Sequence, residues 1–371
     1  MSRDQVFYFF VARCALRVVP GCQMKSLYGL TQKEIETLIV SLGFPKFRAA
    51  QVLGWLYKKY VLSWDEMKNL PKDLLERLAS EYSLTGLQQA ETGMLPGEGT
   101  SKFIFSTQDG HFLESVLISY GKRETVCVST QLGCAVRCPF CASGKTGLLR
   151  SLTAGEIIEQ IVFIARKKGQ PITNVVFMGM GEPLDNFEEV MKALEILTAS
   201  WGFEMGGRKI TVSTSGVPQK IYEFVKRTEG RIRLSVSLHS PDDETRSKLI
   251  PYNRKYPLKE LLAMLGKIHS DLKRDITFEY TLIDGVNDSE GDARAVAKIA
   301  KPLQAKINLI PYNPIREVTW TTPSEERMNH FRETLEKSGV RSTFRKTAGQ
   351  DVEAACGQLR LDRMRSAGAA D

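Results

Sequence analysis

Hydrophobic residues in the second half of the chain follow two alternating periods. Stretches with an apolar residue every three or four positions, the helical period, are separated by short runs rich in Val, Ile and Phe, which favour strands. The predicted helices are Thr153–Lys168, Phe187–Ala199, Gln219–Arg227, Leu258–Leu272, Ala293–Ile299 and Ser324–Lys337. The predicted strands are Asn174–Met178, Ile210–Ser213, Arg233–His239, Ile276–Ile283, Ile307–Tyr312 and Arg341–Arg345, with one more around Val126. Because strands separated by helices pair in parallel, we predict an α/β fold, an open or closed (β/α) barrel with its site at the carboxyl ends of the strands.

The segment from Thr31 to about Tyr82 carries a helical pattern instead. Thr31 to Glu34 have the form of a capping box, and apolar residues recur at helical spacing from Ile35 to about Tyr82. The segment Phe44–Tyr60 mixes aromatic side chains with lysines and arginines, a combination that can hold RNA by stacking and phosphate contacts. An equally simple interpretation is that the aromatic residues form a core and the cations a solvated face. We predict a small helical accessory domain over residues 24–95, with RNA binding as its role.

A β-hairpin is predicted between this helical part and the barrel. The strands Lys102–Thr107 and Phe112–Ser119 flank the turn sequence Gln108-Asp109-Gly110. Strand alternation puts Glu114 on the same face as the apolar residues around it, so a carboxylate stands in an apolar row. Such a position suits a general base that works near neutral pH, although a strand-edge glutamate without a catalytic role gives the same pattern.

Composition adds few constraints. The chain has 371 residues, 42% hydrophobic and 25% charged, which is enough for one large domain and a smaller one. Its formal charge of +8 permits a polyanionic partner, and no apolar run approaches the roughly 18 residues that span a membrane. The apolar run in residues 1–23 is short and is broken by Arg13 and Arg17, so we interpret this segment as a tail or a mis-assigned start. Cysteines that are clustered rather than spread in pairs predict a reducing, cytoplasmic setting.

Three of the seven cysteines lie within eight residues: Cys134, Cys138 and Cys141, in a C-x3-C-x2-C pattern. Thiolates are the ligands of iron–sulfur clusters and of zinc, so we predict a metal-cluster loop. Three ligands leave one iron of a cluster open, whereas a structural zinc site needs a fourth ligand, for which Cys127 is the nearest candidate. The same spacing also fits one face of a helix, but Pro139 disfavours helical backbone at Cys138.

Glycines and polar residues gather at the predicted strand ends. One strand is followed by Gly179-Met180-Gly181-Glu182-Pro183, whose glycines allow close backbone approach to a ligand and whose glutamate can accept a hydrogen bond from an ammonium group. Other strand ends carry Ser213, Ser237-Leu238-His239 and Asn313, each of which alone is an ordinary turn former. Cys356 stands apart between small residues, either as a small buried residue or as a nucleophile that a bulky substrate can reach.

Together these motifs resemble a known family. The cysteine pattern with Gly181-Glu182-Pro183 on a βα barrel resembles the radical S-adenosylmethionine (SAM) superfamily, and longer segments resemble its RNA adenine methyltransferases of the RlmN/Cfr type. These segments are Gln131–Cys141, Phe177–Asn186, Thr211–Gly216, Ser235–His239, Asn308–Pro314 and Gly349–Gly357. The resemblance covers residues 24–360. It implies a partial (β/α) radical-SAM barrel over residues 96–345, extended by the β-hairpin, and a C-terminal segment, residues 346–371, that carries a methyl-accepting cysteine.

The resemblance also implies the cofactors and the residues that bind them. A [4Fe-4S] cluster would be held by Cys134, Cys138 and Cys141, and its open iron would bind SAM. The residues that would line the rest of the SAM site are Gly181, Glu182, Ser213, Ser237, Leu238, His239 and Asn313.

The implied reaction is a two-stage methyl transfer to an adenine ring. Carbon 2 of adenine is too electron-poor to displace a methyl group from a sulfonium, so the carbon is delivered as a radical. One SAM methylates Cys356 by thiolate displacement, and the deoxyadenosyl radical from a second SAM takes a hydrogen atom from that methyl group. The methylene radical adds to the ring. Glu114 is implied as the base that removes the ring proton, and Cys127 as the thiol that attacks the Cys356 sulfur, which leaves a transient disulfide.

The implied substrates are an adenosine of 23S rRNA and an adenosine of tRNA. Methylation at C8, the antibiotic-resistance activity of the sister subfamily, is an alternative to C2, and a non-catalytic metal-binding and RNA-binding protein is an alternative of a different class. The implied partners are an electron donor and a thiol reductant of the cytoplasm, and we expect a monomer without membrane association. Candidate phosphate contacts are Lys102, Arg137, Lys145, Arg150, Arg208 and Lys209.

Overall fold

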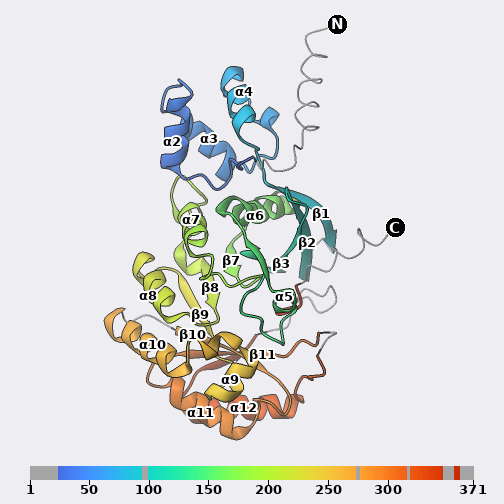
Figure 1. The fold of residues 1–371 in the computed structure, drawn as a ribbon, viewed down its shortest axis with the longest axis vertical. Coiled ribbons are helices and arrows are strands. Elements are labelled where there is room, and N and C mark those ends of the chain that lie inside the picture. The colour runs from blue at the N-terminus through green and yellow to red at the C-terminus, as the bar shows by residue number, and fades with distance from the viewer. Residues whose placement is uncertain (1–23, 94–98, 273–275, 316–317, 346–354, 360–371) are drawn as a thin grey trace.

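The computed structural model describes residues 24–93, 99–272, 276–315, 318–345 and 355–359. The expectations for residues 1–23 and for most of the C-terminal segment lie outside these residues. One sheet of ten strands runs through the molecule in the order β1-β2-β3-β4-β7-β8-β9-β10-β11-β12, and most of the helices pack around it (Figure 1).

Seven neighbouring strands of this sheet pair in parallel. They are β4 (Arg123–Cys127), β7 (Asn174–Phe177), β8 (Ile210–Thr214), β9 (Arg233–Ser237), β10 (Ile276–Leu282), β11 (Lys306–Pro311) and β12 (Ser342–Phe344). In the part of the chain that the structure describes, β12 pairs only with β11 and does not close onto β4. The parallel strands therefore form a partial barrel, and the predicted fold class is confirmed.

Helices connect the parallel strands and follow the outside of the curved sheet (Figure 1). Local sequence fixes where they begin and end. The first of them starts at a capping box of Thr153 and Glu156 and ends at Gly169, whose φ of 72° suits glycine. The six predicted helices are present with small shifts at their ends: α6 (Ala154–Lys168), α7 (Phe187–Thr198), α8 (Pro218–Arg227), α10 (Leu258–Leu272), α11 (Glu290–Ala300) and α12 (Glu325–Lys337).

The N-terminal helices form their own layer at one end of the molecule (Figure 1). They are α2 (Gln32–Ser41), α3 (Arg48–Tyr57) and α4 (Lys72–Glu81), and the predicted capping box of Thr31 and Glu34 is present. Their apolar faces join the main core, in part through Tyr57, whose ring lies 5.8 Å from the Trp201 ring of the barrel. The helical pattern predicted for this part is confirmed.

The predicted hairpin is also present, as β2 (Gly99–Thr107) and β3 (Phe112–Tyr120), and β3 pairs antiparallel with β4. Several short elements did not show in the hydrophobic pattern. They are β1 (Leu87–Gly93), β5 (Gln131–Gly133), β6 (Leu148–Ser151), α5 (Ala142–Lys145), α9 (Asp243–Leu249) and the 3₁₀ turns η1 (Trp64–Glu66), η2 (Gly207–Lys209) and η3 (Pro251–Arg254). Each is short or largely polar, so it carries no clear period.

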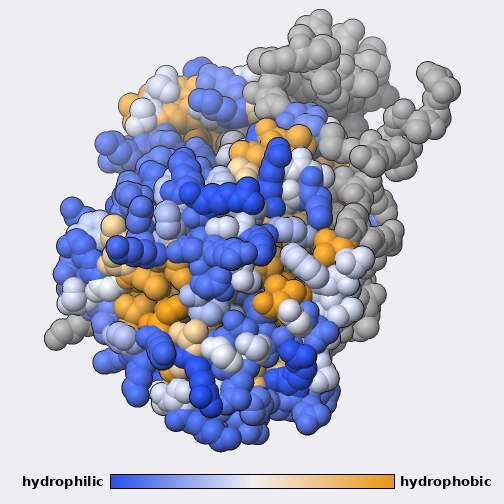
Figure 2. Space-filling model, turned by 60° about the horizontal axis from the view of Figure 1, so that its bottom comes forward, coloured by the Kyte–Doolittle hydropathy of each residue, from blue (hydrophilic) through white to orange (hydrophobic). Residues whose placement is uncertain are grey.

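The surface is mainly hydrophilic, with separate hydrophobic areas between polar ones (Figure 2). Among the described helices, none combines the length and the apolar character needed to cross a membrane.

Candidate active site

A cavity opens at the carboxyl ends of the parallel strands, where the barrel prediction places a site. It encloses about 970 Å³ of empty space including its mouth, a size typical of small-molecule sites. Its walls come from the strand ends of β7 to β11, from the cysteine loop between β5 and α5, and from Cys356 and Gly357. The site thus gathers segments that are far apart in the sequence.

The cysteine loop is a series of turns. It begins at Gly133, whose φ of 76° is left-handed and where a Cβ would approach the carbonyl oxygen of Gly147 to 1.7 Å. The Cys134 N–H donates to this oxygen at 3.0 Å, and the Cys141 N–H donates to the Cys138 carbonyl oxygen at 3.1 Å. The helical interpretation of the C-x3-C-x2-C spacing is therefore wrong, and all three thiols line the cavity.

The three thiols fit an iron–sulfur cluster better than a zinc ion. Among the described residues, no group of three His, Cys, Asp or Glu side chains is arranged to hold a single metal ion, and Cys127 does not line this cavity. A cluster of several irons spreads its thiolate ligands more widely than one ion does. Burial is the main cause that raises the pKa of the thiols of Cys134, Cys138 and Cys141. Binding of cationic iron would release these protons, because the thiolate is the ligand.

The glycine-rich turn after β7 lines the cavity next to the loop. Gly181 has φ 103°, and a Cβ there would meet the Cβ of Gln131 at 2.6 Å, so this position requires glycine. Glu182 is buried, and burial raises the pKa of its carboxyl group. Its Oε1 accepts from the Leu184 N–H at 3.1 Å, and its Oε2 accepts from the Ser215 N–H at 2.7 Å. Each oxygen keeps a second lone pair with which to accept from a ligand.

Four more of the residues predicted to bind the cofactor line the same cavity: Ser213, Ser237, His239 and Asn313. Leu238 is the exception, because its side chain is fully buried in the core and is not among the lining residues. The backbone N–H of Leu238 donates to the Glu279 carbonyl oxygen at 3.0 Å, which extends the pairing of β9 with β10.

His239 is held as a neutral ring. Its Nδ1 accepts from the Thr281 N–H at 3.0 Å, so the ring proton resides on Nε2. Burial lowers the pKa of this imidazole to about 3, and the Phe140 ring packs edge-on against it with centroids 5.0 Å apart. His239 therefore contributes a neutral N–H donor to the site.

Arg246 is a buried cation that sequence reasoning missed. From α9 its guanidinium donates to three backbone carbonyl groups at the ends of β8 and β9 and to the Asn253 Oδ1, at 2.5 to 3.1 Å. Burial lowers its pKa to about 10, which leaves it charged at neutral pH. This charge favours the thiolate of Cys138. The short, polar helix that carries Arg246 had given no signal in the sequence.

A second, smaller pocket adjoins the first. Its walls include residues of β3, Cys127 at the end of β4, and the chain around Cys356. Cys356 and Arg345 line both cavities, so Cys356 lies between the three-cysteine cavity and Cys127. The described cysteines of the two cavities, which are Cys127, Cys134, Cys138, Cys141 and Cys356, are free thiols.

Residues 355–359 dock on the cysteine loop through hydrogen bonds. The Ala142 N–H donates to the Gly357 carbonyl oxygen at 2.7 Å, and the Ser143 hydroxyl donates to the Leu359 carbonyl oxygen at 2.8 Å. The Asn313 Nδ2 donates to the Cys356 carbonyl oxygen at 3.1 Å. These hydrogen bonds fix the backbone around Cys356 at the mouth of the barrel, and Cys356 itself stays exposed.

A charge from Arg345 acts on both sulfurs of the second pocket. Burial raises the pKa of Cys127 to about 12 and the nearby Cys356 adds to the rise, whereas the Arg345 guanidinium lowers it. The pKa of Arg345 is raised in turn, mainly by Cys356. This arginine is a second, partly buried cation of the site that the sequence pattern had not indicated.

Glu114 lies beside the second pocket and is not among the residues that line either cavity. It is buried on β3 and forms an ion pair with Lys102 of β2, with Nζ and Oε1 3.1 Å apart. Val116 and Ile118, further along the same face of β3, do line the second pocket. Glu114 thus stands in an apolar row as expected, and the ammonium group of Lys102 is paired with its carboxylate.

The candidate phosphate contacts fall into two groups. Lys102 and Arg150 are engaged inside the protein, the latter with the carboxylates of Asp109 and Glu156 at 2.6 and 2.7 Å. The others are exposed: Arg137 and Lys145 near the cysteine loop, and Arg208 and Lys209 on η2. The exposed group is the more accessible to RNA.

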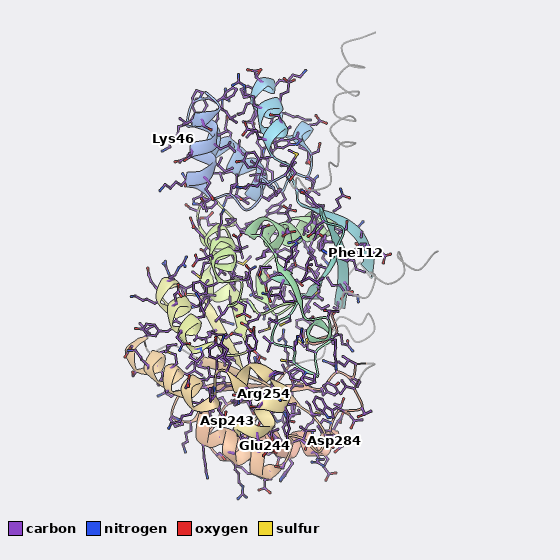
Figure 3. All side chains as sticks on the ribbon, in the orientation of Figure 1. Lys46, Phe112, Asp243, Glu244, Arg254 and Asp284 are labelled. Carbon is purple, nitrogen blue, oxygen red and sulfur yellow. The ribbon has the colours of Figure 1, made fainter. Side chains whose placement is uncertain are left out.

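Cations stand over aromatic rings on the N-terminal helices. Arg48 lies 4.8 Å from the centroid of the Phe47 ring, and Lys59 lies 3.8 Å from that of Trp55. Phe47 is 59% exposed, whereas Tyr57 is buried in the core, so both interpretations of the segment Phe44–Tyr60 hold for different residues. Figure 3 shows Lys46 at this end of the molecule, far from Asp243 and Arg254 of the barrel.

Comparisons with known proteins decide the family. Residues 128–297 match the model of the radical SAM superfamily, and residues 25–84 match the model described as "Ribosomal RNA large subunit methyltransferase N-terminal domain". A curated relative from Clostridium botulinum, "Probable dual-specificity RNA methyltransferase RlmN", is 41% identical over 91% of this chain and 96% of its own length. The chain belongs to the RlmN family of radical SAM RNA methyltransferases.

Further relatives agree with this assignment. An RlmN protein from Desulforamulus reducens is 44% identical over 90% of this chain and 95% of its own. The crystal structure of a radical SAM methyltransferase from Sphaerobacter thermophilus is 43% identical and superposes with a TM-score of 0.86, over 91% of this chain and all of that one. Membership of the RlmN family confirms the predicted enzyme class, and it rules out the non-catalytic alternative. The superfamily implies SAM and an iron–sulfur cluster as cofactors.

Proposed function

We propose that this enzyme methylates carbon 2 of adenosine in 23S rRNA and in tRNA by way of a methylated Cys356. The observation that carries the proposal is the position of Cys356, which lines both the three-cysteine cavity and the pocket that contains Cys127. In this place the Cys356 sulfur can accept a methyl group in the first cavity. The Cys127 thiol can then reach the same sulfur from the second pocket and break its bond to the carbon. The name of the relatives, probable dual-specificity RNA methyltransferase, supports two classes of RNA as substrates.

Cys134, Cys138 and Cys141 of the loop would hold a [4Fe-4S] cluster, which would supply the electron for the reductive cleavage of SAM. SAM is bound further by side chains that line the cavity and by the backbone of Leu238. These side chains are Glu182, Ser213, Ser237, His239 and Asn313, with Gly181 providing close backbone approach. The neutral Nε2–H of His239 and the second lone pairs of Glu182 match the acceptors and donors of SAM.

In the first stage the Cys356 thiolate displaces the methyl group of one SAM, which forms a thioether and S-adenosylhomocysteine. Arg345 lines both cavities together with Cys356 and so places a cation beside this sulfur. No reductant takes part, because the displacement is a two-electron substitution.

In the second stage the methyl group on Cys356 loses a hydrogen atom to the deoxyadenosyl radical from another SAM. The resulting methylene radical adds to C2 of adenine. The adduct would return one electron to the cluster that was oxidised when SAM was cleaved, and its ring proton would pass to Glu114. The ion pair with Lys102 holds the Glu114 carboxylate in place next to the second pocket.

Release of the methylated RNA uses the thiol of Cys127. The Cys127 thiolate attacks the Cys356 sulfur, the methylene carbon leaves and takes up a proton, and a disulfide remains. A thiol reductant then restores both cysteines. Burial raises the pKa of Cys127 and the Arg345 cation lowers it in part, so this thiol has to give up its proton before it attacks.

RNA approaches the site over the exposed cations beside the cysteine loop and over the N-terminal helices. A target base in structured RNA has to be splayed out to enter a cavity of this kind. The exposed Phe47 with Arg48 offers a stacking surface with a positive charge, and Arg137 and Lys145 lie beside the cysteine loop.

The test is anaerobic reconstitution with iron and sulfide, followed by incubation with SAM, a one-electron reductant and 23S rRNA or tRNA. Mass spectrometry of digested RNA then maps the methyladenosine. We expect 2-methyladenosine from both RNAs with the wild type and none with Cys356→Ala. Product at C8 would instead assign the sister activity, and no methylated adenosine with an intact cluster would contradict the proposal.

A further inference from the structure

Glu279 is a buried carboxylate with one oxygen that lacks a partner among the described residues. It lies in the middle of β10, is 3% exposed and lines the main cavity. Its Oε1 accepts from the Asn308 Nδ2 at 3.0 Å, whereas its Oε2 is buried and makes no hydrogen bond. Leaving a buried charged acceptor unsatisfied is costly, so such an atom indicates a donor that comes from a ligand.

The neighbouring strand fixes the orientation of this carboxylate. Asn308 stands opposite Glu279 in the parallel pairing of β10 with β11. The Oδ1 of Asn308 accepts from the Thr343 hydroxyl at 3.0 Å, so its Nδ2 is turned to Glu279. Because Oε1 accepts from Asn308, Oε2 is the oxygen that remains to accept a hydrogen bond from a ligand in the cavity.

The partly buried cation nearby, Arg345, does not satisfy Oε2. Arg345 interacts with the charge of Glu279, but its guanidinium donates to the Met178 sulfur at 3.0 Å and forms no hydrogen bond with this oxygen. Its charge offsets part of the cost of a carboxylate in the cavity and leaves the hydrogen-bonding position open.

The strand order indicates which part of a ligand reaches Glu279. The cysteine loop follows β4 and Glu182 follows β7, whereas Glu279 is on β10, three strands further along the sheet. A SAM molecule with its amino-acid end at the loop and Glu182 extends its nucleoside toward the later strands. The donors of the nucleoside are the adenine amino group and the ribose hydroxyl groups, and the hydroxyl groups form the shorter hydrogen bonds with a carboxylate.

We infer that Glu279 is a further SAM-binding residue, whose Oε2 accepts a hydrogen bond from a ribose hydroxyl group. The inference rests on the proposed function, because it requires SAM in this cavity. It assigns the nucleoside end of the ligand to β10 and β11, beyond the strand ends that the sequence motifs had indicated.

The test compares ligands that differ only at the ribose. S-adenosylhomocysteine has the same nucleoside and amino-acid parts as SAM but has no methyl group to transfer, so it binds without modifying Cys356. Binding of S-adenosylhomocysteine and of its 2′-deoxy and 3′-deoxy forms is measured by calorimetry on the reconstituted full chain, as wild type, Glu279→Gln and Glu279→Asp. The matched control is Glu124→Gln, a buried carboxylate at the start of β4 that does not line the cavity.

We expect the wild type to bind one of the deoxy forms about tenfold more weakly than the parent ligand. Glu279→Gln should bind the parent about tenfold more weakly and discriminate no longer, and the shorter Glu279→Asp should also lose discrimination. Glu124→Gln should behave as the wild type does. Full discrimination in either Glu279 variant would overturn the inference alone. No binding of S-adenosylhomocysteine by the reconstituted wild type would contradict the proposed function itself, and with it the inference.

Discussion

The five described cysteines have the same side chain and differ in what surrounds them. Cys134, Cys138 and Cys141 line one cavity, whereas Cys127 lines the adjoining pocket and Cys356 lines both. Spacing along the chain predicted the first group, because ligands of one centre come from one loop. The second pair could not be predicted from spacing, since these residues meet only when the C-terminal segment docks on the loop. Their pairing came from the family resemblance alone.

Replacing Cys127 tests the release step. In Cys127→Ala the methylene bridge between Cys356 and the adenine ring has no thiol to break it, so a covalent protein–RNA adduct should accumulate. The measurement is denaturing gel electrophoresis with labelled RNA, followed by mass spectrometry of the cross-linked peptide. Cys127→Ala combined with Cys356→Ala is the control and should form no adduct. An active Cys127→Ala enzyme that turns over without any adduct would contradict the resolving role.

Arg246 is predicted to hold the strand ends together. Arg246→Gln leaves several buried carbonyl groups without a donor, so we expect a loss of about 2–4 kcal/mol in the free energy of unfolding. Urea denaturation measures it. The matched control is Arg227→Gln, whose guanidinium is partly exposed and pairs with Glu188 at the surface, and it should lose less than about 1 kcal/mol. Equal losses in the two variants would contradict this role.

At the scale of elements, long periodic segments were predictable and short polar ones were not. The parallel strands and their helices are present because apolar periods and caps agree with each other over many residues. The short helix α9 has no such period, so its buried Arg246 was missed. Glu279 was missed for a related reason, since a lone glutamate in a strand gives no indication of the side of the sheet on which a ligand binds.

Helix α6 is joined to the N-terminal part by a buried carboxyl group. The Oε2 of Glu159 accepts from the Gly86 and Leu87 N–H groups at 2.8 and 2.6 Å, and its Oε1 lies 2.5 Å from the Ser26 hydroxyl oxygen. Burial raises the pKa of Glu159 to about 7. The Ser26 hydroxyl can donate to this Oε1 or to the Leu84 carbonyl oxygen, which lies 3.2 Å away.

This carboxyl group predicts a pH dependence of stability. The pKa of Glu159 is higher in the folded protein than its ordinary value of 4.5, so its contribution to the free energy of unfolding is complete below about pH 4.5 and is lost as the pH rises through about 7. The loss is on the order of 3 kcal/mol. Glu159→Gln keeps a neutral side chain, so its stability relative to the wild type should increase over this range in urea denaturation.

The control for this comparison is Glu195→Gln, an exposed carboxylate on α7. Its stability relative to the wild type should stay constant with pH. A constant difference for Glu159→Gln as well would show that the Glu159 carboxyl group does not take up a proton on folding.

At the scale of the whole molecule, the N-terminal helices lie at one end and the cavity lies at the carboxyl ends of the barrel strands (Figure 1). This arrangement allows RNA to be bound over a wide surface while one base enters the cavity. The overall charge of +8 is consistent with such a surface, although it does not locate it.

Phe47 and Arg48 test the role of the N-terminal surface. Phe47→Ala with Arg48→Ala removes an exposed ring and the charge above it, so we expect about tenfold weaker RNA binding and a smaller salt dependence. Binding of S-adenosylhomocysteine should not change. Fluorescence anisotropy with labelled tRNA at several salt concentrations measures the effect. Leu272→Ala, at an exposed apolar residue on α10, is the control, and RNA binding that is equal in both variants would assign the surface another role.

The most direct test of the two-stage transfer follows the hydrogen atoms of the methyl group. The reconstituted enzyme is incubated with SAM that carries a fully deuterated methyl group, a reductant and RNA. The mass of the product nucleoside is then measured by mass spectrometry. Transfer through Cys356 predicts that one deuterium of the new C2 methyl group has been replaced by hydrogen and appears in 5′-deoxyadenosine. A methyl group that keeps all of its deuterium would show direct transfer and would contradict the role of Cys356.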